Sequence, residues 1–111
     1  MKKMKENSNL YEMANIKQST SGLPVIIFIS PKGRANHGHR VKVQNNYSSN
    51  TQEGNFFSIT ISEDPEIIGD IGEVKSSDLR KIREFVIKNK EVLLDYWNDK
   101  IDTAEVIEKL F

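Results

Sequence analysis

The chain contains no cysteine and, among its 111 residues, only two histidines and three prolines. Without thiols the protein can form neither a disulfide framework nor a thiolate zinc site, and it lacks a cysteine nucleophile. Long apolar runs are missing as well: the longest covers residues 25–29, whereas a membrane-spanning helix needs about 20 apolar residues. The N-terminal lysines lead into a polar stretch instead of a signal-peptide core. We therefore expect a cytoplasmic protein without a membrane partner.

A net charge is also absent, since 16 acidic side chains balance 16 basic ones. Binding to nucleic acid or anionic lipid would therefore depend on a local patch and not on the overall charge. Apolar residues make up 37% of the chain and charged residues 29%, which is typical of a sequence that folds. The length suits one domain. We predict a polar, partly mobile leader over residues 1–22 and a single α+β domain over residues 23–111.

Strand patterns mark three segments, and a fourth segment is ambiguous. Residues 23–30 are apolar on both faces, which predicts a largely buried strand. Residues 39–44 alternate between apolar and polar, so one face of that strand should be core and the other, which includes Gln44, wet. A third alternating strand begins near Phe56. Residues 66–74 fit either a bent fourth strand or an ordered loop.

Helical signals occupy both ends of the chain. In the leader, apolar residues spaced three apart predict at most a short helix over residues 10–16. Further on, Ser76 or Ser77 is the expected N-cap of an amphipathic helix, whose apolar stripe should pack on the sheet and end in Trp97 as a core residue. A break near Asn89 leaves open whether this segment is one helix or two.

A last short helix is predicted by the pair Asp102 and Glu105, which has the spacing of a capping box. Together these elements predict an α+β fold. We expect a three- to four-stranded antiparallel sheet, packed by a long C-terminal amphipathic helix and a short terminal helix.

The most distinctive segment is the basic segment, residues 32–42, which holds four cations and both histidines but no acid. Basic side chains can contact phosphates, and arginine offers a planar fork for two phosphate oxygens. The predicted binding residues are Lys32, Arg34, His37, His39, Arg40 and Lys42. The alternative is a solvated loop whose charge is balanced by Glu63, Asp64 and Glu66.

The two histidines allow a second interpretation. His37 and His39 are two residues apart, so both rings point to one face if the strand extends back to His37. As an acid/base pair they could cleave RNA, with Arg34, Arg40 or Lys42 stabilising the phosphate. The simpler alternative makes His39 a partly buried strand residue. We predict no metal site, because the sequence specifies no third ligand, and no cofactor.

Acids gather at the other end of the chain. Residues 91–111 hold six acids and two lysines, opposite in sign to the basic segment. Two poles of opposite charge favour either internal pairing or docking on a charged partner.

Three different motifs follow one another between residues 23 and 99. They are the apolar strand, the sequence His37-Gly-His39 leading into a strand, and a helix that ends in Leu-Leu-Asp-Tyr-Trp97. Together they resemble small bacterial and phage proteins of a domain-of-unknown-function family, in which a Pro-x-His-x-His strand precedes a helix closing with Leu-Leu-x-x-Trp. Members are often encoded beside a second small protein, as in toxin–antitoxin pairs. The resemblance implies a small intracellular α+β protein with a protein partner.

Our leading hypothesis is a non-enzymatic binding or regulatory protein that acts through a protein or nucleic-acid partner. It would resemble a member of a toxin–antitoxin pair or a phage anti-defence inhibitor. The alternative is a small toxin-like ribonuclease that uses His37 and His39. The sequence leaves open whether the protein forms a dimer, because short domains often cover a free sheet edge with another chain.

Overall fold

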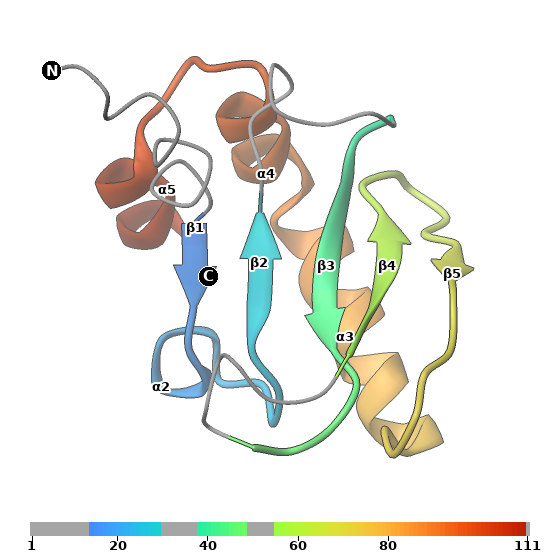
Figure 1. Cartoon of the computed structure of the whole chain (residues 1–111). Coiled ribbons are helices and arrows are strands. Elements are labelled where there is room, and N and C mark those ends of the chain that lie inside the picture. The colour runs from blue at the N-terminus through green and yellow to red at the C-terminus, as the bar shows by residue number, and fades with distance from the viewer. Residues whose placement is uncertain (1–13, 30–37, 49–54, 111) are drawn as a thin grey trace, which may run out of the picture.

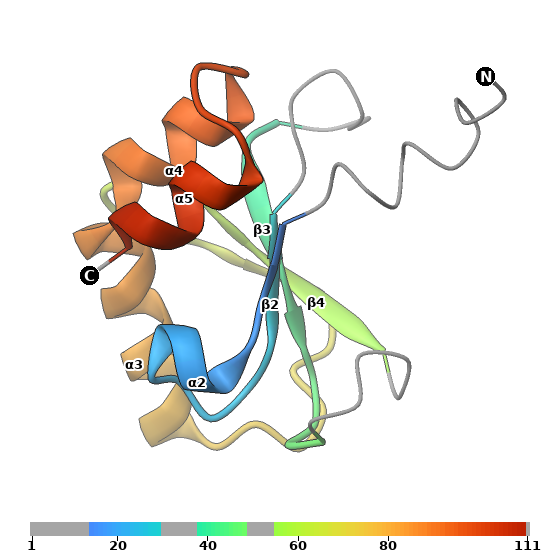
Figure 2. The ribbon, with the colours of Figure 1, turned by 90° about the vertical axis from the view of Figure 1, so that its left-hand side faces the viewer.

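A computed structural model of the chain describes residues 14–29, 38–48 and 55–110. Five strands pair antiparallel in their chain order: β1 (Ala14–Ile16), β2 (Ile27–Ile29), β3 (Arg40–Gln44), β4 (Phe56–Thr60) and β5 (Ile67–Ile68). Three helices follow: α3 (Ser76–Lys88), α4 (Lys90–Trp97) and α5 (Thr103–Lys109). They cover one face of the sheet (Figure 1, Figure 2). The predicted α+β class and the antiparallel sheet are therefore confirmed.

The sheet has five strands, one more than the upper limit of our prediction. The additional strand is β1, where the sequence predicted a helix over residues 10–16. Ala14 and Ile16 are fully buried on either side of the exposed Asn15, and Ala14 lies opposite Ile29 in the register. Burial with a period of two, against the edge of β2, outweighs a weak helical spacing. Residues 10–13 lie outside the described part of the chain.

The sheet thus includes residues that the sequence analysis assigned to the leader. A single helical turn, α2 (Gln18–Ser21), follows β1 and ends at Gly22, whose φ of 78° is in the left-handed region. The next strand, β2, is shorter than the predicted 23–30, although Leu23 and Val25 before it are buried. At the other edge, the ambiguous segment 66–74 forms the two-residue strand β5 and then a loop.

The core lies between the sheet and the three C-terminal helices. Every second strand residue faces this layer, and the helices contribute Ile82, Phe85 and Val86 from α3 and Leu93 and Tyr96 from α4. Of these helices, α5 packs against strand β1 and α4 packs against strand β2. Trp97 is 4% exposed, which confirms it as a buried residue. Within the described residues no helix is long and apolar enough to cross a membrane.

The start of α3 differs from the prediction. Neither Ser76 nor Ser77 is the N-cap; that position is Lys75, which makes no side-chain capping bond. Instead the Tyr47 hydroxyl accepts a hydrogen bond from the Lys75 backbone N–H at 2.9 Å and donates one to Asp78 Oδ2 at 2.8 Å. Tyr47, three residues beyond the end of β3, therefore ties the N-cap residue and the first turn of α3 to the sheet.

The long helical segment is two helices, divided at Asn89. This residue is 1% exposed, and its side-chain Nδ2 donates to the Phe85 backbone oxygen at 2.9 Å. At the last helix the predicted capping box is confirmed: Asp102 Oδ1 accepts from the Glu105 N–H, and Glu105 Oε1 accepts from the Asp102 N–H.

Candidate functional site

The two faces of the sheet differ in what covers them. The helices lie on one face, and no described helix lies on the other, which is the side that Figure 1 shows to the viewer (Figure 2). We call the side without a described helix the open face. The pairing register aligns one row of open-face residues across all five strands: Asn15, Phe28, Lys42, Ser58 and Ile68. Neighbouring open-face residues on β3 and β4 are Arg40, Gln44, Phe56 and Thr60.

Two aromatic rings meet on the open face. Phe28 on β2 and Phe56 on β4 have ring centroids 5.1 Å apart and form an edge-to-face pair. Their strands flank β3 and so lie about 10 Å apart, twice the spacing of paired strands. Both rings must therefore lean over β3. Phe56 remains 38% exposed, which is high for a large apolar side chain.

One prediction for a residue beside this pair was wrong. Gln44 was expected on a wet face, yet it is fully buried. It lies directly opposite Phe56 in the register, and Phe56 leans from that position toward Phe28. Alternation along one strand takes no account of the ring on the neighbouring strand, so it would leave this polar side chain exposed.

Two cations from the basic segment lie on the open face beside these rings. Lys42 is exposed and is the cross-strand partner of Phe28, and Arg40 is half-buried opposite Thr60. Neither cation forms an ion pair with an acid among the residues that the structure describes. The described part of the basic segment thus brings positive charge to this face of the sheet.

The acids that could have balanced this charge are mostly engaged elsewhere. Glu63 pairs with Lys90 of α4 at 3.5 Å, and Asp64 pairs with Arg83 of α3 at 3.1 Å. Both interactions lie toward the helix layer. Glu66 is nearer, because its backbone N–H donates to Thr60 Oγ1 at the β5 edge. Two of the three expected counter-charges therefore do not compensate the open face.

His39 does not join this cluster. Its ring packs edge-to-face against Trp97 of α4, with centroids 6.2 Å apart, so it lies on the helix side of the sheet. The structure therefore divides the predicted binding residues between two sides, with Arg40 and Lys42 on one and His39 on the other. The remaining predicted residues, Lys32, Arg34 and His37, lie outside the described part of the chain.

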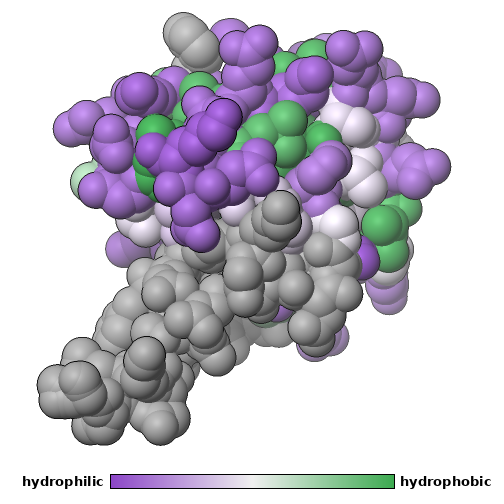
Figure 3. Space-filling view, turned by 90° about the horizontal axis from the view of Figure 1, so that it is seen from above, coloured by the Kyte–Doolittle hydropathy of each residue, from purple (hydrophilic) through white to green (hydrophobic). Residues whose placement is uncertain are grey.

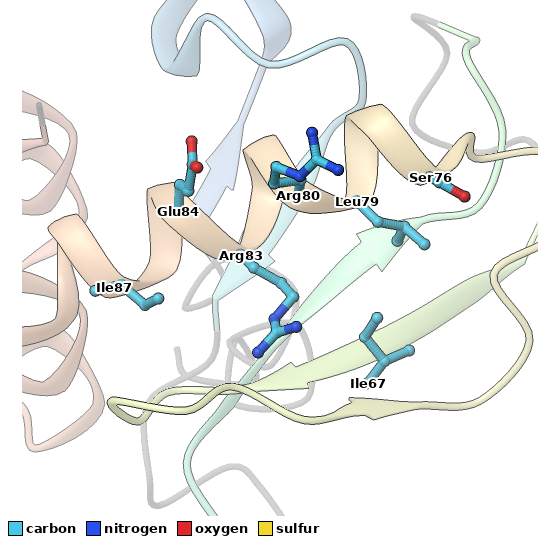
Figure 4. Close-up of a pocket in the computed structure, with 7 residues that line it drawn as sticks. All are labelled: Ile67, Ser76, Leu79, Arg80, Arg83, Glu84 and Ile87. Atoms are coloured by element: carbon cyan, nitrogen blue, oxygen red, sulfur yellow. The ribbon is translucent and has the colours of Figure 1, made fainter.

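A second surface feature is a groove of about 370 Å³ between β5 and α3 (Figure 4). Ile67 points toward Leu79 across the groove, and Ile87 lines its far end. Arg83 reaches down from α3 and is held by its ion pair with Asp64. The strand at this edge is only two residues long, which leaves little backbone for a partner strand to pair with.

Figure 3 shows the molecule from above. Among the described residues in this view hydrophilic side chains predominate, with small hydrophobic patches between them. In the described part of the chain, no three side chains of His, Asp or Glu gather closely enough to hold a metal ion.

Three residues of the open face escaped sequence analysis: Phe28, Phe56 and Ile68. Phe28 sits in a run that is apolar on both faces, so nothing local marks it as surface. Phe56 carried a usable signal, because it is out of phase with the buried Phe57 and Ile59. Ile68 belongs to a segment whose structure was ambiguous.

Comparison with models of protein families, with curated proteins and with solved structures finds no match. The resemblance to small bacterial and phage proteins stays a prediction.

Proposed function

We propose that this protein is a small, non-enzymatic binding module that recruits its partner through the open face of the sheet. One observation carries the proposal: Phe28 and Phe56 form an aromatic pair on a face that no described helix covers, beside the cations Arg40 and Lys42. Aromatic residues and arginine are enriched in binding interfaces. An exposed apolar group next to uncompensated charge gains most when a partner covers the one and neutralises the other.

The position of His39 argues against the ribonuclease alternative. A phosphate held by Arg40 and Lys42 would lie on the open face, whereas the His39 ring contacts Trp97 on the helix side. General acid/base catalysis needs the imidazole within hydrogen-bond reach of the reacting group, directly or through one water. These residues therefore support binding of a phosphate better than its cleavage.

A binding module of this kind would suit a regulatory protein of a toxin–antitoxin-like pair or a phage-encoded anti-defence inhibitor. In either role the open face would hold the partner, which is a protein or a nucleic acid. This assignment rests on the sequence resemblance and on the small size of the domain.

The test is affinity capture from a lysate of the cells that encode the protein, with and without nuclease treatment. The wild-type protein is compared with the double variant Arg40→Ala/Lys42→Ala and with a matched control, Arg80→Ala/Lys88→Ala. The control removes the same charges from exposed positions on α3. We expect a partner that the control retains and the open-face variant loses. Capture that both variants retain equally, or no capture by the wild type, would refute the proposal.

A further inference from the structure

The position of Lys42 narrows the class of partner. It lies on the central strand of the sheet, between Phe28 and Ser58 in the register. A protein that covered the aromatic pair would also have to remove the water around this ammonium group, which is costly unless an acid pairs with it. Lysine is accordingly depleted in protein interfaces. A nucleic acid, in contrast, supplies a negative phosphate at every nucleotide.

We infer that the partner of the open face is single-stranded nucleic acid. Bases would stack on the Phe28 and Phe56 rings, and Arg40 and Lys42 would hold the phosphates. The inference rests on the proposed function and specifies its ligand. It needs only groups that the described residues already bring together on one side of the sheet.

The aromatic pair favours an unpaired strand over a duplex. Stacking on a protein ring requires the face of a base, and the bases of a duplex cover one another's faces. A sheet that presents aromatic rings flanked by basic side chains can bind successive unstacked bases without reading their sequence. RNA and DNA share this chemistry, and the described residues do not distinguish them, so both are probes in the test.

The charge distribution supports the same ligand. The chain has no net charge, but Glu63 and Asp64 are directed to Lys90 and Arg83 in the helix layer. This arrangement leaves the open face positive without raising the charge of the whole protein. The side that carries the rings can therefore attract a polyanion although the chain as a whole is neutral.

The test measures binding of fluorescein-labelled oligo(dT) and oligo(U) of about 12 nucleotides, within the range of known site sizes, by fluorescence anisotropy. A DNA duplex of the same length is the comparison ligand. We expect the single strands to bind more tightly than the duplex. Replacing Phe56 by leucine should weaken binding about 5- to 100-fold, whereas Phe56→Tyr should bind like the wild type, because it keeps the aromatic face.

The cations are tested through salt dependence. The variant Arg40→Ala/Lys42→Ala should lower the slope of log affinity against log salt concentration by about 0.7 for each charge removed. The control Arg80→Ala/Lys88→Ala should leave the slope unchanged. Circular dichroism and thermal melting establish that each variant is folded.

The outcomes separate this inference from the proposed function. Equal binding by Phe56→Leu and wild type, a preference for the duplex, or no binding of either single strand at low salt would overturn the nucleic-acid inference. If the lysate still yields a partner protein that depends on Arg40 and Lys42, the binding module stands and its ligand is a protein. If both assays fail, both proposals fall.

Discussion

Replacing Gly72 by alanine should destabilise the protein much more than the same change at Gly22. Both glycines have left-handed backbones, with φ of 59° at Gly72 and 78° at Gly22. An alanine in this conformation costs about 1–2 kcal/mol. The two sites therefore share one penalty, and any difference between them reports on their surroundings.

The surroundings differ sharply. A Cβ atom at Gly72 would lie 2.5 Å from the backbone oxygen of Asn45, whereas one at Gly22 would meet nothing within 4 Å. Asn45 cannot easily retreat, because its oxygen accepts from the Glu73 N–H and its N–H donates to the Asn55 oxygen, each at 3.0 Å. Relief would have to shift the loop or break these bonds, each worth about 1 kcal/mol. We expect a total loss above about 3 kcal/mol at Gly72.

Urea unfolding followed by circular dichroism measures both losses. We expect the free energy of unfolding to fall by about 1–2 kcal/mol for Gly22→Ala and by at least twice as much for Gly72→Ala. Gly38→Ala is a further control, since Gly38 lacks a left-handed φ and its added Cβ would meet nothing within 4 Å. Equal losses for Gly22→Ala and Gly72→Ala would refute the close packing of the 70–73 loop against the end of β3.

Three further perturbations test other parts of the fold. Partial burial and the Asp78 carboxylate raise the pKa of Tyr47 above its ordinary value of 10.0. The hydrogen bond that the hydroxyl accepts from the Lys75 N–H lowers this pKa, but by less. The stabilisation from this hydroxyl is therefore complete below pH 10 and is lost as the pH rises through the raised pKa. Tyr47→Phe should lower the melting temperature at pH 8, and its difference from the wild type should shrink at higher pH; a constant difference would contradict this. Asp102→Ala should cost about 1 kcal/mol of unfolding free energy by removing the cap of α5, whereas the exposed Glu108→Ala should cost little, and equal effects in urea titrations would speak against the capping box. Trp97, the sole tryptophan and 4% exposed, should resist acrylamide quenching until the protein unfolds, and ready quenching of the native protein would show that it is not buried.

Local signals predicted those elements whose determinants lie close together in the chain. The capping box needs only Asp102 and Glu105, three residues apart, and it forms as predicted. The alternation of Phe57 and Ile59 needs only one strand, and both residues are buried. The break at Asn89 was visible because it interrupts an otherwise continuous helical pattern, although the choice between one helix and two required the structure.

The errors share a cause. Ala14–Ile16 is a strand because β2 offers it a partner, the buried Gln44 lies opposite Phe56 of another strand, and the N–H of Lys75, the N-cap of α3, donates to the Tyr47 hydroxyl. In each case the partner is a residue distant in sequence. Propensity and periodicity describe only the residues within a few positions of one another.

The candidate site divides in the same way. Charge composition does not depend on the fold, so the sequence alone showed that residues 32–42 hold four cations and no acid. Alternation along a single strand likewise separated Arg40 and Lys42 from His39, as the structure confirms. That Phe28 and Phe56 meet beside the two cations could not be predicted without the pairing of the strands. A strand sends successive side chains to opposite faces, which the sequence of that strand reveals, whereas pairing with its neighbours brings residues far apart in the chain onto the same face.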